Sequence, residues 1–222
     1  MALLYFGYKL KCPICGRHFR KFMPYGRISR PNAQCPSCLS LERHRLIWLY
    51  LTNKTDLLKH RMRILHFAPE KCISDRLRKL NNIEYTTADI SSLSVDVIMD
   101  ITKIPCKSNS YHIILCSHVL EHVLDDKSAM KELYRILRPD GLVILQVPIG
   151  RKTFEDASIT NWEDRERIFC QGDHVRIYGL DFAERLRSVG FFVMVKYSYK
   201  EYDKNTIEKY RLSTENIYLC RK

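Results

Sequence analysis

The 222-residue chain carries 37 Lys and Arg against 25 Asp and Glu, a formal net charge of +12, and 45% of its residues are hydrophobic. This length allows one sizeable domain and a small additional module. No apolar run approaches the ~20 residues of a membrane-spanning helix, and the first residues lack a signal-peptide pattern. We therefore expect a soluble, cytoplasmic protein without a membrane span.

Four of the nine cysteines form two Cys-x-x-Cys pairs near the N-terminus, Cys12 with Cys15 and Cys35 with Cys38. Nineteen residues separate the pairs, a spacing typical of a four-cysteine zinc site. Each turn directs two thiolates at one point, and two turns complete a tetrahedron. Four protein ligands leave no open position, so the pattern predicts a structural zinc ribbon over residues 1–40.

Residues 1–63 hold most of the positive charge, with 13 Lys and Arg against 2 Asp and Glu. Between the cysteine pairs, the stretch "RHFRKFMPYGRISRPNAQ" mixes basic and aromatic side chains. Such a mixture can grip phosphates and stack on bases, which favours RNA as a partner. A solvated basic face that supports the larger domain or covers its active site fits equally well.

A linking helix is predicted next, from Leu41 to Lys59, within a linker over residues 41–62. Ser40 can cap it, and the apolar stretch Leu46 to Leu51 indicates burial.

From Arg63 onward, strand-like runs alternate with helix-like runs. The pattern predicts an α/β fold over residues 63–222, with a seven-stranded Rossmann-like mixed sheet that ends in an antiparallel pair. The expected strands are Ile64–Phe67, Ile83–Thr87, Val95–Met99, Tyr111–Cys116, Leu142–Val147, Phe191–Tyr197 and Ile217–Cys220.

Polar residues follow three consecutive strands of this set. Asp89 follows the second strand, Asp100 the third, and Ser117 with His118 the fourth. Open α/β sheets bind ligands at the carboxyl ends of their strands. A carboxylate there can accept hydrogen bonds from ribose hydroxyls or from an adenine amino group.

The stretch "DVIMDITKIPCKSNSYHIILCSHVLEHVLDDKSAMKELYRILRPDGLVILQVP", from Asp96 to Pro148, resembles the middle of a class I S-adenosylmethionine-dependent methyltransferase. The resemblance extends over about Arg63 to Lys222. It implies that Asp89 holds the ribose of S-adenosylmethionine and that Asp100 with Ile101 frames the adenine.

The first motif of that family, normally an acid and a run of glycines, reads "HFAPE" here. The chain therefore resembles a divergent bacterial branch with an "hFAPE" first motif and an N-terminal cysteine-rich segment. Ala68 is small enough for backbone to approach a ligand, and Glu70 is expected to bind the cofactor's ammonium group. The expected cofactor-binding residues here are His66, Phe67, Ala68, Pro69 and Glu70, with Ser117 and His118 after the fourth strand. The segment between Asp89 and Asp100 is short, so its usual helix should be reduced.

The stretch "SHVLEH" places His118 and His122 four residues apart, with Glu121 beside them. On a helix the two histidines share a face. The pattern suggests metal, but no third ligand is evident in the sequence. We expect His118 to lie beside the cofactor, where it is a reserve candidate for catalysis, and His122 to cap a helix or fill the core.

A polar stretch, "RERIFCQGDHVRIYGLDF", lies between the fifth and sixth strands and concentrates Asp173, His174, Arg176 and Tyr178 in six residues. Long loops over the carboxyl edge of a sheet often carry function. His174 could deprotonate an acceptor hydroxyl, and Arg176 could hold an anionic substrate. The branch that the chain resembles tends to carry "DHVRxYG" here. A lid whose polar groups only satisfy its own backbone is the alternative.

Three functions remain open at this point. The first is methyl transfer to a small-molecule or saccharide-type acceptor at oxygen. The second is methylation of RNA held by the ribbon, although no "NPPY"-type motif follows the fourth strand. The third is a non-catalytic, nucleic-acid-binding adaptor on a degenerate methyltransferase fold.

Overall fold

The computed structural model describes residues 2–56 and 59–222. The chain divides into two compact units. The first contains Met1–Arg61, Glu70–Ile83 and Lys196–Asn216, and the second contains Met62–Pro69, Glu84–Val195 and Ile217–Lys222. Within the described residues, no helix combines the length and the apolar character needed to cross a bilayer. These two units do not test which segments fold independently. The domain boundaries expected at residues 40 and 62 therefore stay predictions.

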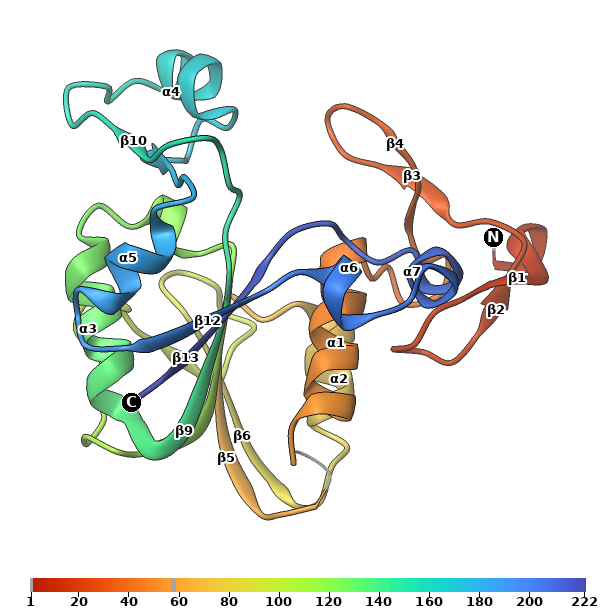
Figure 1. Ribbon diagram of the computed structural model, residues 1–222, viewed down its shortest axis with the longest axis horizontal. Coiled ribbons are helices and arrows are strands. Elements are labelled where there is room, and N and C mark those ends of the chain that lie inside the picture. The colour runs from red at the N-terminus through yellow and green to blue at the C-terminus, as the bar shows by residue number, and fades with distance from the viewer. Residues whose placement is uncertain (1, 57–58) are drawn as a thin grey trace. The chain divides into compact units, whose positions relative to one another are not determined.

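The second unit is built on a seven-stranded sheet with the order β12-β13-β9-β8-β5-β6-β7 (Figure 1). Its strands in chain order are β5 (Met62–Phe67), β6 (Ile83–Asp89), β7 (Val97–Ile98), β8 (Tyr111–Ser117), β9 (Leu137–Gln146), β12 (Phe192–Lys196) and β13 (Ile217–Arg221). β8 pairs in parallel with β5 and with β9, β6 pairs in parallel with β7, and β13 pairs antiparallel with β9. The predicted α/β fold with a mixed sheet is confirmed.

Apolar side chains explain why these segments pair in the middle of the sheet. Ile64 and Leu65 of β5, and Ile114 of β8, have no more than a trace of exposed surface. Two helices, α3 (Asp126–Ile136) and α5 (Phe182–Arg187), cover one face of the sheet (Figure 1). Their buried side chains belong to the same apolar cluster as the strands, which places the core between these helices and the sheet.

Two loops of this unit differ from regular βα units. No helix intervenes between β6 and β7, as the short segment between Asp89 and Asp100 predicted. β7 is only two residues long, shorter than the predicted Val95–Met99. β9 begins at Leu137, earlier than predicted, and its pairing with β8 is irregular around Pro139, Asp140 and Gly141.

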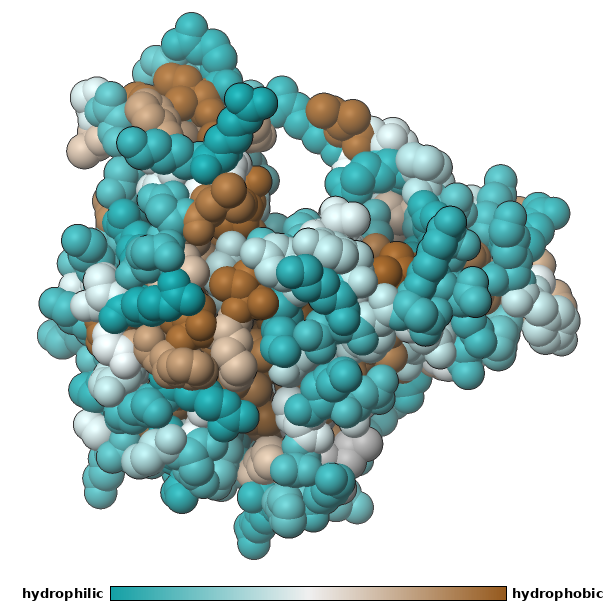
Figure 2. Space-filling view, viewed as in Figure 1, coloured by the Kyte–Doolittle hydropathy of each residue, from teal (hydrophilic) through white to brown (hydrophobic). Residues whose placement is uncertain are grey.

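The connection between β9 and α5 contains a small substructure of its own. β10 (Phe154–Glu155) pairs antiparallel with β11 (Arg176–Ile177), and α4 (Trp162–Phe169) lies between them in the chain. Figure 2 shows hydrophobic residues grouped over α4 and β10, at the top of the view. Phe154 and Trp162 are about half exposed there.

The first unit combines two hairpins with four helices. β1 (Phe6–Lys11) pairs with β2 (His18–Phe19), and β3 (Met23–Tyr25) pairs with β4 (Arg30–Gln34). The helices and the 3-10 turn of this unit are η1 (Ala2–Tyr5), α1 (Glu42–Lys54), α2 (Lys71–Leu77), α6 (Ser198–Glu201) and α7 (Lys204–Tyr210).

The predicted start and end of the linking helix both change. The N-cap is Leu41, whose backbone N–H donates to Nδ1 of His44, so the predicted Ser40 cap is wrong. The hydroxyl of Ser40 instead lies 3.3 Å from the sulfurs of Cys12 and Cys38. α1 ends at Lys54, before the predicted Lys59, and residues 57–58 of the predicted helix lie outside the described residues.

A fully buried arginine ties the first unit together. Arg45 of α1 donates to the carbonyls of Ala33 and Ser40 at 3.0 and 2.6 Å, and to those of Tyr210 and Arg211 at 2.7 Å each. Burial lowers the pKa of its guanidinium. Four carbonyl partners compensate the cost of burying this charge, and they join the second hairpin to the end of α7.

Candidate functional site

A cavity of about 520 Å³ opens at the carboxyl ends of four neighbouring strands. β5 and β8 are adjacent strands, and the strand order reverses between them because β5 leads to β6 on one side and β8 leads to β9 on the other. Doubly wound folds bind ligands at such a point. The lining comes from the ends of β5, β6 and β7 and from the turn after β8. Its residues are Phe67, Ala68, Asp89, Ile90, Met99, Asp100, Ile101, Thr102, Val119, His122, Val123, Leu124 and Asp125.

Two of the predicted carboxylates, Asp89 and Asp100, line this cavity. Asp89 accepts hydrogen bonds at Oδ1 from the backbone N–H groups of Ser91 and Ser92, both at 2.9 Å. Asp100 accepts at Oδ1 from the N–H and the hydroxyl of Thr102, both at 2.8 Å. In each case Oδ1 fixes the side chain locally, and among the described residues no hydrogen bond reaches Oδ2, which leaves it as an acceptor for a ligand.

The first motif contains no glycine, yet one of its residues adopts a left-handed backbone conformation. Ala68 has φ 45°, in the left-handed region that favours glycine. Its N–H donates to the carbonyl of Ala88 at 2.8 Å, which holds the end of β5 beside the end of β6. Phe67 and Ala68 line the cavity from this motif.

The remaining predicted residues of the first motif have identifiable partners. His66 is buried, and its Nδ1 lies 2.8 Å from the hydroxyl of Tyr85. Glu70 is the N-cap residue of α2, and its Oε1 lies 3.8 Å from Nε2 of His44. The expected contacts of His66, Pro69 and Glu70 with a cofactor stay predictions.

The turn after β8 carries a second left-handed residue, His118, with φ 54°. Its N–H donates to the carbonyl of Gln146 at 2.8 Å. The neighbouring Ser117 is buried, and its hydroxyl has no hydrogen-bond partner among the described residues. A short helix, η2 (Leu120–His122), follows. The expected contacts of Ser117 and His118 with a cofactor stay predictions.

His122 is the histidine of this turn that lines the cavity. Its Nδ1 lies 3.2 Å from the carbonyl oxygen of Asp173 and 3.4 Å from Oδ2 of the same residue. The ring of His174 packs edge-on against it, with centroids 4.7 Å apart. The sequence interpretation of His122 as a core or capping residue did not foresee this position.

His174 lies behind His122 and is only 7% exposed. Its Nδ1 lies 3.2 Å from the carbonyl oxygen of Phe169. Burial lowers the pKa of His174, which favours the neutral ring. His174 is not among the residues lining the cavity, so its predicted role as a general base stays untested and its contacts favour an indirect one.

Arg176 is almost wholly buried and braces the turn after β8. Its guanidinium donates to the carbonyls of Leu120 (3.0 Å), Val123 and Leu124 (2.8 Å), and its Nε donates to Glu155 at 2.8 Å. A substrate anion would have to compete with these partners. The predicted anion contact stays untested, and the hydrogen bonds favour a positioning role.

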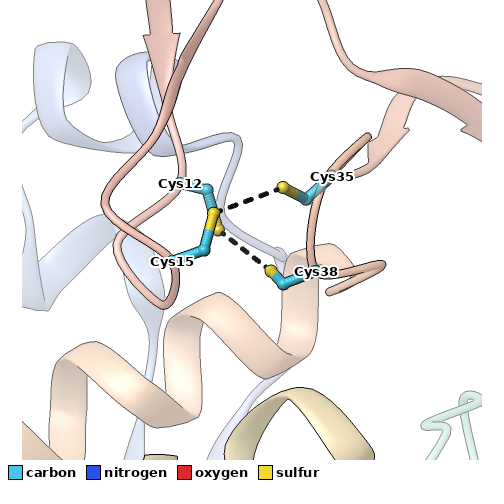
Figure 3. A group of neighbouring side chains, drawn as sticks. All are labelled: Cys12, Cys15, Cys35 and Cys38. Carbon is cyan, nitrogen blue, oxygen red and sulfur yellow. Dashed lines mark hydrogen bonds between the residues drawn. The ribbon is translucent and has the colours of Figure 1, made fainter. Parts of the chain in front are cut away.

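A separate cluster brings the four predicted cysteines together in the first unit (Figure 3). The sulfurs of Cys12 and Cys38 lie 3.6 Å apart, and those of Cys15 and Cys35 lie 3.8 Å apart. A tetrahedron with zinc–sulfur bonds of ~2.3 Å has sulfur–sulfur edges of ~3.8 Å. These two sulfur–sulfur distances match a zinc site, and all four sulfurs lie within 4.8 Å of one another.

The comparisons with known proteins are in line with a ligand-binding role for this cavity. Residues 71–145 match a family model described as "Methyltransferase domain". Residues 71–145 therefore belong to a methyltransferase domain. No curated protein sequence matches the chain.

Several solved structures share the fold of this methyltransferase domain. A SAM-dependent methyltransferase from Archaeoglobus fulgidus is 13% identical, with a TM-score of 0.53, over 80% of this chain and 93% of that one. The YcgJ protein from Bacillus subtilis is 13% identical, with a TM-score of 0.52, over 81% and 99%. The [4+2]-cyclase SpnF is 15% identical, with a TM-score of 0.58, over 80% and 81%. Identities this low show the fold alone, and the cyclase illustrates that the fold does not by itself set the reaction.

Proposed function

We propose that the chain transfers the methyl group of S-adenosylmethionine to an oxygen atom of a small-molecule or saccharide-type acceptor. One observation carries the proposal: the cavity at the carboxyl ends of β5, β6, β7 and β8, with a carboxylate at the ends of two neighbouring strands. Its volume falls within the range of small-molecule and cofactor sites.

The lining residues fit the chemistry of this cofactor. Asp89 would accept hydrogen bonds from the ribose hydroxyls through its Oδ2, because Oδ1 is already occupied. Asp100 would face the adenine amino group, between the apolar side chains of Met99 and Ile101. Ala68 stands in a left-handed conformation at a position where the family has glycine. Its side chain is a single methyl group, so it adds little bulk there.

The bound cofactor would supply an electrophilic methyl carbon for an in-line displacement. The chain's main task is then to align the acceptor oxygen and exclude water. A hydroxyl acceptor must also lose its proton. In this proposal the polar cluster at the cavity wall, formed by His122 with Glu121 and His174 behind it, would take part in removing that proton.

Calorimetry with S-adenosylmethionine and S-adenosylhomocysteine tests the cofactor assignment. Asp89→Ala should weaken binding by ~1.5–3 kcal/mol, the range for a hydrogen bond to a charged group, which is roughly a 10- to 150-fold loss of affinity. Asp164→Ala is the matched control, because among the described residues its carboxylate accepts from Asn161 and Arg167, both in its own helix region. Unchanged affinity in Asp89→Ala and in Asp100→Ala would refute the assignment.

The acceptor class is tested by mass spectrometry of small molecules that co-purify with the chain. A methylated saccharide or other small hydroxyl compound supports the proposal. Methylated nucleotides in RNA, recovered after incubation with labelled cofactor, would contradict it and favour the second candidate.

That second candidate is an RNA methyltransferase, and one observation favours it. The first unit exposes Phe6 and Tyr8 on β1 and Tyr25 on β3, at 59%, 77% and 45%, among its many basic side chains. Exposed aromatics on a basic surface can stack on unpaired bases. RNA affinity that falls steeply with salt, and falls further in Tyr8→Ala, would support this candidate over the first.

We also propose that Cys12, Cys15, Cys35 and Cys38 hold one structural zinc ion. The support is the sulfur spacing described above and the absence of an open ligand position in a four-thiolate site. Elemental analysis of protein purified without chelator tests it. A Cys35→Ser variant that retains the zinc content of the wild type would contradict it.

A further inference from the structure

Three side chains of the kinds that bind metals meet beside the cofactor cavity. Glu121 and His122 come from η2, and His174 comes from the loop before β11, more than 50 positions later in the chain. One ligand atom from each lies within 4.8 Å of the other two. The sequence showed His118, Glu121 and His122 but no further ligand, and the fold supplies it as His174.

Glu121 is a buried carboxylate in need of a cation. Only 1% of the residue is exposed, and neither carboxylate oxygen accepts a hydrogen bond from any described residue. Nδ1 of His118 lies 3.2 Å from Oε1, a distance that allows an ion pair but with an angle unsuited to a hydrogen bond. Leaving a buried carboxylate without a hydrogen bond costs several kcal/mol.

Both histidines of the cluster have their Nδ1 atoms committed elsewhere. Nδ1 of His174 faces the carbonyl oxygen of Phe169, and Nδ1 of His122 faces two oxygens of Asp173. An oxygen acceptor at Nδ1 keeps the proton there and leaves Nε2 as a lone-pair donor. Metal-binding histidines show this arrangement, in which a carbonyl or carboxylate orients the ring.

We propose that Glu121, His122 and His174 bind one divalent transition-metal ion of the zinc class. Two imidazoles and one carboxylate form a common catalytic zinc set, which leaves a further position open. Zinc bound at ~2.0–2.1 Å has ligand atoms ~3.3 Å apart, so the three side chains would draw together by up to ~1.5 Å on binding. The Glu121 carboxylate, which accepts no hydrogen bond from the described residues, would then gain a cation as its ligand partner.

The ion would lie at the wall of the cofactor cavity, because His122 belongs to both. Its open position would bind the acceptor oxygen and lower the pKa of that hydroxyl. This role rests on the proposed function, whereas the binding of the ion does not.

Cobalt titration of the full chain tests the site and separates it from the cysteine cluster. A four-thiolate site gives sulfur-to-cobalt charge-transfer absorption, and a nitrogen and oxygen site gives only weak d–d bands. We expect two Co²⁺ ions per chain, one of each spectral type. His174→Ala and Glu121→Gln should each weaken the second ion more than the 10- to 100-fold typical of lost outer partners, and leave the thiolate spectrum unchanged.

Two further variants sharpen the result. Asp173→Asn should weaken the second ion by roughly 10- to 100-fold, because it alters a partner of His122 and not a ligand. His60→Ala, which removes an exposed histidine outside the cluster, should bind both ions like the wild type. Thermal melting with and without Co²⁺ tests the site even where a variant folds poorly. The ion should raise the melting temperature of the wild type more than that of Glu121→Gln.

A single ion per chain with only the thiolate spectrum, in wild type and variants alike, would overturn the proposal. So would a second ion that survives both His174→Ala and Glu121→Gln. Calorimetry with S-adenosylmethionine on the same samples keeps the proposals apart. A second ion without cofactor binding removes the proposed function and leaves the metal site standing.

Discussion

Arg176→Met removes the guanidinium that braces the turn after β8 and keeps most of the side chain's volume. The variant withdraws a charged donor from the carbonyls of Leu120, Val123 and Leu124. Losing a hydrogen bond to a charged group typically costs ~1.5–3 kcal/mol. Glu155 keeps Arg185 at 3.0 Å, so no buried charge is left without a partner.

The magnitude should fall at the lower end of that range. The carbonyl of Leu120 still accepts from the Tyr178 hydroxyl at 3.3 Å, and Leu124 is 73% exposed, so its carbonyl can turn to water. We therefore expect Arg176→Met to lower the free energy of unfolding by ~2 kcal/mol. Arg176→Lys should lose nearly as much, because an ammonium group cannot reach three carbonyls with a planar fork.

Urea unfolding followed by circular dichroism measures this loss, with zinc held constant in the buffer. Arg167→Met is the control, since Arg167 forms an exposed pair with Asp164 at 2.6 Å and should contribute no more than ~0.5 kcal/mol. Because the braced turn forms part of the cavity wall, cofactor affinity should fall together with stability. A loss below ~1 kcal/mol, or a rise only in the Michaelis constant for the acceptor, would refute the positioning role and restore the anion-binding one.

Three further predictions each concern one substitution. Cys35→Ser should lower the melting temperature, because structural zinc binding contributes to folding free energy; an unchanged melting curve would contradict this. Gly179→Ala places a β-carbon 2.3 Å from backbone atoms of Lys152 and should cost ~1–3 kcal/mol in urea unfolding, whereas a neutral result would mean that the loop moves freely. The hydrogen bond from Arg135 holds the pKa of Glu132 below its ordinary value of 4.5, so this stabilisation is present above pH 4.5 and is lost as the pH falls further. Glu132→Gln should thus be less stable than the wild type at pH 7 and approach it in acid, and a constant difference from pH 7 to pH 3 would contradict the assignment.

Local signals were enough to predict most of the sheet. Buried strands such as β5 and β8 are continuous apolar runs, and their positions were predicted to within two residues at each end. β7 is different because Val97 and Ile98 are both exposed, so burial does not define its ends. The Ser40 cap failed because a serine beside a helix start can serve another partner, here the sulfurs of the cysteine cluster.

The site was only partly predictable because its contacts join distant segments. Asp89 and Asp100 could be placed from strand ends alone, since parallel strands bring their carboxyl ends to one edge. His122 was misjudged because its partners, Asp173 and His174, lie some 50 residues away. The sequence did offer one signal for a metal site, two histidines four residues apart beside a glutamate. It was not taken as a metal prediction because no further ligand was evident in the sequence.

The loop between β9 and α5 therefore acts on the cavity through the turn after β8. Arg176 holds the turn's carbonyls, Asp173 faces the ring of His122, and Val175 donates its N–H to the carbonyl of Glu121 at 2.9 Å. The carboxylates expected to hold the cofactor lie elsewhere, at the end of β6 and after β7. Substitutions in this loop should consequently change the acceptor chemistry and the stability of the turn more than they change the recognition of ribose and adenine.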